Sequence, residues 1–438
     1  MNKLQMFIII GAIVFALIAV LILLGALPGL QNSADNQGAA LAMWGFDEEL
    51  KFQEIFPAYS EQKPNISVTY TQKNFESFED DFLNALAKGG ASVPDIVIFP
   101  SDYFVKHKDK LSRAPDIFVT EREIKQDFVD STSFFINSGS DAPPNAQGIL
   151  GMPFYADALV LYTNSDIFNQ NSIALVPKTW DEFLEISQKL TKKDVNGNIT
   201  LAGAALGRAQ NIRHAPLILE TFFLQSGEKI IDSNGEVVLG NVVALGGADL
   251  RPAESSLRFI SDFANPRKTS QSWSGTLPEA KEAFIAGKLA MYLGLIREFE
   301  EIKNKNPHLA FSVSLLPQLS GASRAITSGT LYALVVPKVS AKQKQAWEFI
   351  SFLANAENAS FFAGATKNVS LRRAAIKNYQ KEAVRSVFAD SALNLKLWPN
   401  PDPMLTDSIF RELIENVSSG RETLRDALEK VAGKLSEI

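Results

Sequence analysis

Apolar positions along the chain repeat with two spacings, and the two kinds of segment alternate. Short apolar or alternating runs cover 40–44, 66–70 and 95–99, as expected of strands, whereas 50–59 and 78–86 carry apolar side chains every three or four positions, as one face of a helix does. The first helix is predicted to open at Asp47 and to end before Pro64. Strands separated by helices pair in parallel and are covered on both faces, so the pattern predicts an α/β fold.

The same alternation continues toward the end of the chain. Thr179 and Glu182 have the spacing of a capping box at a helix start, and Asn196-Gly197 indicates a hairpin turn. Further strands are predicted at 158–162 and 331–336, and further helices at 216–227, 252–266, 278–287, 346–354 and 424–435. Because no linker, repeat or low-complexity block separates these elements, we expect two lobes whose segments interleave.

The first thirty residues differ from the rest. Phe7–Leu27 is almost entirely apolar, and no charge lies between Lys3 and Asp35. As a helix this stretch would span about 31 Å, which matches a bilayer core. We therefore expect a cytoplasmic stub and transmembrane signal anchor over 1–30, a flexible tether over 31–39, and an exported domain over 40–438. Cleavage as a signal peptide remains the alternative, although the small-residue pair Gly38 and Ala40 lies far from the apolar run.

Composition excludes several classes of function. The formal net charge of −6 gives no basic footprint for nucleic acid. The absence of cysteine excludes disulfides, thiol catalysis and cysteine-bound zinc or iron–sulfur clusters. The histidines His107, His214 and His308 do not have metal-ligand spacing, so we expect no metal and no cofactor.

Three tryptophans lie where a ring is hard to bury. Trp44, Trp273 and Trp398 sit at a strand end or in loops rich in Gly, Ser and Pro. Loops after strand ends line the ligand crevice of α/β proteins, and aromatic faces there suit sugar rings or other amphipathic molecules. Burial of the same rings in the core is the alternative. Acidic clusters such as Asp47-Glu48-Glu49 and Glu79-Asp80-Asp81 could supply a glycosidase pair, but carboxylates at helix starts are also explained by the helix dipole.

Several segments in a fixed order resemble the extracellular solute-binding proteins of ABC importers, the family that includes maltose-binding protein. They are MWGFDEELKFQEIFPAYSEQKPNISVTY, VPDIVIFPSDY, GMPFYADALVLYTNSDIF, PKTWDEFLEISQKLT, AFIAGKLAMYLG, and AWEFISFLANAENASFF with Arg372-Arg373 after it. Two departures are visible. The mid-chain strand ends in Tyr162-Thr163-Asn164 where the family commonly has Tyr-Asn, which puts the register of nearby site residues in doubt. The family's lipidation cysteine is missing, and the apolar N-terminal helix would tether the protein instead.

The resemblance implies a periplasmic-binding-protein-like (type II) fold with a ligand cleft between two α/β lobes. Lobe 1 would comprise approximately 40–153 plus 332–372, and lobe 2 approximately 154–328 plus 373–438. The chain would cross between them near 152–155, 328–332 and 371–374. By position, the residues expected at the cleft are Trp44, Phe46, Ser101, Asp102 and Tyr103 from the first lobe, Tyr155 at the crossing, and Asn211, Arg213, Trp273, Tyr292 and Trp398 from the other side.

The function implied is that of a membrane-tethered receptor outside the cell. It would capture a small solute, expected to be a sugar or oligosaccharide, and deliver it to the permease subunits of an ABC transporter. Aromatic rings would stack on the solute, while Asp102, Asn211 and Arg213 would hydrogen-bond to its hydroxyls. We expect a monomer that catalyses no reaction. An anchored extracellular hydrolase and a sensor or surface module without transport remain as alternatives.

Overall fold

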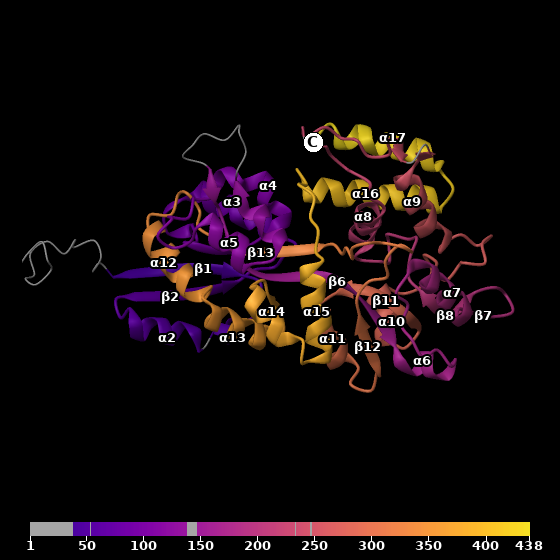
Figure 1. Ribbon diagram of the computed structural model, residues 1–438, viewed down its shortest axis with the longest axis horizontal. Helices are drawn as coiled ribbons and strands as arrows, with labels where there is room; N and C mark the ends of the chain where they lie inside the picture. Colours follow the sequence, from indigo (N-terminus) through magenta and orange to yellow (C-terminus); the bar gives the residue numbers. More distant parts are fainter. Residues whose placement is uncertain (1–37, 53, 138–146, 233, 246–247) are drawn as a thin grey trace, which may run out of the picture.

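The computed structural model describes residues 38–52, 54–137, 147–232, 234–245 and 248–438. Over these residues a ten-stranded sheet runs through the molecule in the order β2-β1-β3-β13-β6-β11-β8-β7, with β12 and β14 also paired to β6 (Figure 1). Its strands are β1 (Ala39–Gly45), β2 (Ile66–Gln72), β3 (Ile96–Pro100), β6 (Met152–Asn164), β7 (Lys192–Lys193), β8 (Ile199–Ala204), β11 (Leu289–Leu295), β12 (Phe311–Ser314), β13 (Gly329–Val335) and β14 (Val369–Ser370). Two small antiparallel sheets pair β4 (Ile136–Asn137) with β5 (Gly148–Ile149) and β9 (Val243–Leu245) with β10 (Ala248–Leu250).

Helices surround both ends of this sheet, so the molecule has two lobes. The first lobe is built around β1, β2 and β3, and the second around β8 and β11 (Figure 1). The helices are α2 (Ile55–Gln62), α3 (Phe78–Lys88), α4 (Phe104–His107), α5 (Glu121–Asp127), α6 (Ser165–Gln170), α7 (Trp180–Leu190), α8 (Ala215–Ser226), α9 (Pro252–Asp262), α10 (Ala280–Ile285), α11 (Glu298–Lys305), α12 (Gln343–Leu353), α13 (Ala356–Thr366), α14 (Arg373–Tyr379), α15 (Ala383–Leu393), α16 (Pro403–Ser418) and α17 (Leu424–Leu435). The predicted α/β class is confirmed.

One long strand joins the lobes. All thirteen residues of β6 are buried, which explains why its sequence is apolar without alternation. The first part of β6 pairs with β13 and β14, and its second part pairs with β11 and β12. The parallel pairing expected from the sequence occurs between β1 and its neighbours β2 and β3 and between β8 and β11, whereas β13 and β6 run antiparallel at the crossing.

Local sequence signals explain where most elements begin and end. Thr179 accepts a hydrogen bond from the Glu182 amide while the Glu182 carboxylate accepts one from the Thr179 amide, so the predicted capping box starts α7. Gly197 adopts a φ of +83° in the predicted turn between β7 and β8. The predicted helices at 216–227, 252–266 and 424–435 correspond to α8, α9 and α17.

The first predicted helix is wrong in its extent. The chain after Asp47 forms a short 3₁₀ turn over Glu49–Phe52, and α2 begins only at Ile55. Pro57 gives the physical reason, because it lacks an amide hydrogen and its ring excludes the helical carbonyl four residues earlier. A proline is tolerated in the first turn of a helix, so α2 starts just before it and no continuous helix forms from Asp47.

The predicted signal anchor at 1–30 and most of the tether at 31–39 lie outside the described residues. Within the part of the chain that the structure describes, every helix is too short or too polar to cross a membrane.

Candidate functional site

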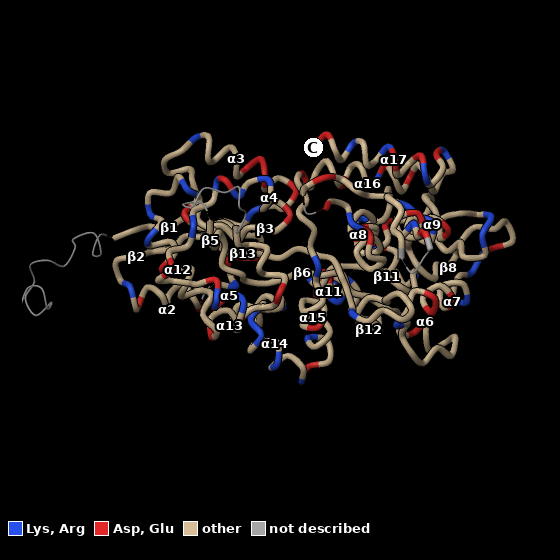
Figure 2. Tube along the Cα trace, turned by 45° about the horizontal axis from the view of Figure 1, so that its top comes forward, with Lys and Arg blue, Asp and Glu red and all other residues tan. Residues whose placement is uncertain are grey.

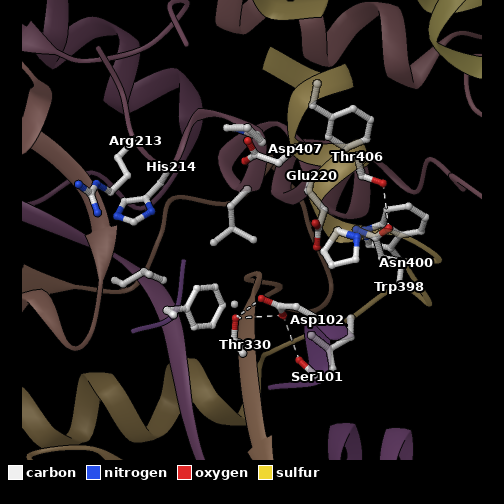
Figure 3. Close-up of a pocket in the computed structure, with 18 of the residues that line it drawn as sticks. Ser101, Asp102, Arg213, His214, Glu220, Thr330, Trp398, Asn400, Thr406 and Asp407 are labelled. Atoms are coloured by element: carbon white, nitrogen blue, oxygen red, sulfur yellow. Dashed lines mark hydrogen bonds between the residues drawn. The ribbon is translucent and has the colours of Figure 1, made fainter. Parts of the chain in front are cut away.

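A pocket of ≈ 230 Å³ lies where the two lobes face each other across the crossing strands. Its lining comes from both sides, as Figure 3 shows: Ser101, Asp102 and Thr330 lie below the cavity, and Glu220, Trp398 and Asp407 lie above and beside it. A second hollow of ≈ 480 Å³ shares Phe134 and Leu397 with the first. The cleft therefore continues beyond the central pocket.

The carboxylate of Asp102 occupies the floor of the pocket. Asp102 follows the buried strand β3, in the 3₁₀ turn Ser101–Tyr103, so the end of the strand presents it to the cleft. Thr330 Oγ1 donates to both carboxylate oxygens, at 3.1 and 3.0 Å, and Ser101 Oγ donates at 3.3 Å. Burial raises the pKa of Asp102 to about 6, although these donors and Arg297 oppose the rise.

Glu220 faces Asp102 from the opposite wall. It lies on α8, which has Pro216 in its first turn and packs against α9 and α16 of the second lobe. The carboxyl groups of Glu220 and Asp102 point toward each other across the cavity (Figure 3). Burial raises the pKa of Glu220 to about 8, the nearby Asp102 charge adds to the rise, and the Trp398 and Ser328 side chains oppose it.

The side wall is built by the segment that leads into α16. Asp402 caps α16 by accepting from the amides of Met404 and Leu405, both at 3.1 Å. Asn400 Oδ1 accepts from Thr406 Oγ1 at 2.8 Å, which ties the loop to the helix. These contacts hold the Trp398 ring at the pocket, where 8% of its surface is exposed.

The structure brings four of the eleven predicted site residues to the pocket, namely Ser101, Asp102, Arg213 and Trp398. Ser101 also fixes the crossing strand, because its Oγ accepts from the Leu331 amide at 3.0 Å. Arg213 lies at the rim, with a side chain that is 61% exposed.

Three predicted residues of the second lobe are packed away from the pocket. Trp273 is fully buried, and its Nε1 donates to Asn211 Oδ1 at 3.0 Å. The Asn211 amide nitrogen donates to two loop carbonyls, of Ser274 and Leu277, at 3.0 and 2.9 Å, so Asn211 holds a loop together. The Tyr292 hydroxyl donates to Glu298 Oε2 at 2.8 Å inside the core. In this conformation their hydrogen-bonding groups are occupied by protein partners.

The remaining four predicted residues form a layer behind the pocket or at its margin. Phe46 and Tyr103 pack against Phe75, which itself lines the pocket. Tyr155 is buried and stacks on Tyr332, and its hydroxyl donates to Asp47 Oδ2 at 3.0 Å. Trp44 lies outside the lining, with the Lys73 ammonium 3.9 Å from its ring centroid.

Sequence reasoning missed Glu220 and Thr330. Glu220 is the only acidic residue in the apolar segment 215–226, an oddity that could have drawn attention to it. Thr330 could have been expected from its place in the predicted crossing at 328–332.

Among the residues that the structure describes, no group of three or more carboxylate and histidine side chains lies close enough together to hold a metal ion. Figure 2 shows acidic and basic residues interspersed over both lobes.

The family is decided by a direct comparison of sequences. The family model described as bacterial extracellular solute-binding protein matches residues 46–360. The chain belongs to this family. The resemblance inferred from the sequence is thereby confirmed.

Individual relatives are distant. A probable ABC transporter-binding protein of Deinococcus radiodurans is 23% identical over 212 residues, which are 48% of each chain. The match therefore spans about half the length of that relative. The sn-glycerol-3-phosphate-binding periplasmic protein of Pectobacterium atrosepticum is 23% identical over 64% of each chain. A solute-binding protein of Thermotoga lettingae bound with α-D-tagatose superposes with a TM-score of 0.70 at 18% identity, covering 91% of this chain and 99% of that one. This likeness shows that the two-lobe fold is shared.

Proposed function

We propose that this solute-binding protein captures a small carbohydrate between its lobes and delivers it to the permease of an ABC importer. The observation that carries the proposal is a pocket with hydrogen-bonding groups from both lobes, Asp102 and Thr330 on one side and Arg213 on the other, beside the Trp398 ring. An aromatic face with a few polar groups suits a sugar ring. The tagatose-bound structure supports the choice of ligand class.

Binding across the cleft would also explain closure. A ligand shifts an open–closed equilibrium only through its different affinity for the two states. Asp102 and Trp398 belong to opposite lobes, so a solute that contacts both binds more tightly when the lobes are closed. We propose that the chain acts as a monomer held to the outer face of the membrane by residues 1–30, with crossings near 152–155, 328–332 and 371–374 as lobe boundaries.

The test is a titration with monosaccharides and disaccharides, followed by tryptophan fluorescence and calorimetry. Trp398 lines the pocket whereas Trp273 is fully buried, so Trp398→Phe should abolish most of the ligand-induced fluorescence change and weaken binding about tenfold. Trp347→Phe is the matched control, because Trp347 is buried in α12 and does not line the pocket. If no saccharide changes the fluorescence or the melting temperature, the carbohydrate assignment is wrong.

One observation favours a second candidate, a glycoside hydrolase. Two carboxyl groups that face each other across a pocket, with the pKa of Glu220 raised further than that of Asp102, resemble the acid pair of such enzymes. We propose binding without catalysis, because the family consists of binding proteins. Incubation with bound disaccharide should return it intact, and release of monosaccharide that is lost in Asp102→Asn would establish the hydrolase instead.

A further inference from the structure

The ionisable side chains that line the pocket divide into paired and unpaired groups. Most of them have an ionisable partner of the opposite type from the protein within 4.0 Å: Arg213 with Glu76, His214 with Glu298, Arg297 with Asp157, and Asp407 with Arg411. Asp102 and Glu220 are the exceptions. Among the described residues, neither has a Lys, Arg or His nitrogen within that distance. Asp102 and Glu220 are therefore the two acidic groups of the pocket to which the protein supplies no cationic partner.

The neutral contacts of the two groups orient them without cancelling their charge. Thr330 and Ser101 donate hydroxyl hydrogens to Asp102. The buried Ser328 hydroxyl faces the Glu220 carboxyl without completing a hydrogen bond to any residue that the structure describes. The Trp398 side chain also faces Glu220 and lines the same end of the cavity.

A partner with positive charge would satisfy this arrangement. Two facing carboxylates repel each other, and burial makes the charged form of each costly unless a cation compensates it. Carboxylates beside an indole ring are also the groups that recognise an ammonium ion in proteins. A neutral sugar supplies hydroxyl donors but no positive charge for these two carboxyl groups.

We propose that the solute carries a protonated amine among its hydroxyl groups, and that Asp102 and Glu220 hold this amine between the lobes beside Trp398. The chemical class is an amino sugar or a closely related hydroxylated amine. The proposal rests on the carbohydrate-binding function proposed above and specifies the ligand class of the same pocket.

Matched pairs of ligands test this inference by calorimetry at pH 7. The probes are D-glucosamine, D-galactosamine and D-mannosamine, each against its neutral parent sugar and its N-acetyl derivative, together with the anionic probes D-glucuronate and sn-glycerol 3-phosphate. At least one free amine should bind ten times or more tightly than its neutral parent and its N-acetyl derivative. The anionic probes should bind more weakly than the neutral sugars.

Two variants locate the effect. Glu220→Gln keeps the size and the hydrogen-bonding atoms but removes the charge, so it should weaken binding of the amine about tenfold or more and leave the neutral parent nearly unchanged. Glu357→Gln, at an exposed position in the first turn of α13, should change neither.

The outcomes separate this inference from the proposed function. Neutral sugars that bind as tightly as their amines, or more tightly, overturn the inference while the carbohydrate receptor stands. Tighter binding of an anionic probe overturns it as well. If none of the saccharides binds, neutral or charged, both the function and the inference fail.

Discussion

The Glu220 carboxyl makes stability depend on pH in a specific direction. Its pKa is about 8 in the folded protein, raised chiefly by burial above its ordinary value of 4.5. Between these values the folded state retains a proton that the unfolded state has lost, so the free energy of unfolding falls as pH rises through the window. The slope for one such group is at most about 1.4 kcal/mol per pH unit. Glu220→Gln should remove this slope and make the variant more stable than the parent at pH 8.

The measurement is the melting temperature of parent and variant without ligand from pH 5 to 8.5. Asp102 and Asp47, whose pKa values burial raises to about 6, contribute with the same sign at lower pH, so the comparison is cleanest between pH 6 and 8. Glu357→Gln should follow the parent throughout. Parallel curves for parent and Glu220→Gln would show that Glu220 is ionised in the folded protein at neutral pH.

At the residue scale, a site residue could be predicted from the sequence when its position at the end of a strand was enough to place it at the cleft. Asp102 could be placed because the end of a buried strand faces the cleft. Trp273 could not be told from a ligand-stacking ring, because the partner that holds it in the core, Asn211, lies 62 positions earlier in the chain. Tyr292 differs, because the Glu298 carboxylate that accepts from its hydroxyl lies only six positions later, and what the sequence did not show is that this pair is buried.

At the element scale, Gly329 determines how closely β13 approaches β6 at the crossing. A Cβ added there would lie 2.2 Å from the Asp157 carbonyl oxygen and 2.6 Å from the Ala158 Cα, and backbone cannot yield as a flexible side chain does. Gly329→Ala should therefore destabilise the protein by about 1–3 kcal/mol through overpacking. Because Gly329 also lines the pocket, the same substitution should weaken saccharide binding. Denaturant unfolding and calorimetry measure the two effects.

Gly364→Ala is the control for this substitution. Gly364 lies in α13, and nothing stands within 4 Å of a Cβ built there. Alanine is the better helix former by roughly 1 kcal/mol, so the control should be as stable as the parent or more stable. If Gly329→Ala is also neutral, the two strands can separate at the crossing without cost.

Helices were easier to predict than the faces they turn to the cleft. The segment 216–227 was predicted as a helix and forms α8, but apolar residues surround this helix on nearly all sides. An amphipathic stripe would have shown which face is exposed. Without one, the orientation of Glu220 follows only from the packing of α8 against α9 and α16, which sequence periodicity does not contain.

At the scale of the whole molecule, Lys106 connects the lobes beside the pocket. Its ammonium lies 2.8 Å from Glu79 Oε1 in the first lobe and 2.7 Å from Asp402 Oδ2, at the start of α16 in the second. All three side chains are at least two thirds buried, with Lys106 30% exposed and each carboxylate 14%. The Lys106–Asp402 pair exists only while the lobes are close together, so it favours the closed arrangement even without ligand.

Lys106→Met should therefore open the empty protein and weaken ligand binding. A partly exposed ion pair contributes about 0.2–1 kcal/mol, which corresponds to a shift of up to about fivefold in the open–closed ratio. Small-angle scattering should show a larger radius of gyration for the empty variant, and a saturating saccharide should restore the parent value. Lys110→Met is the matched control, since Lys110 pairs with the adjacent Asp109 at 3.1 Å and bridges no lobes. If Lys106→Met and the parent have the same scattering and the same affinity, the Lys106–Asp402 pair does not favour closure. Closure would then depend only on the contacts of the ligand with Asp102, Glu220 and Trp398.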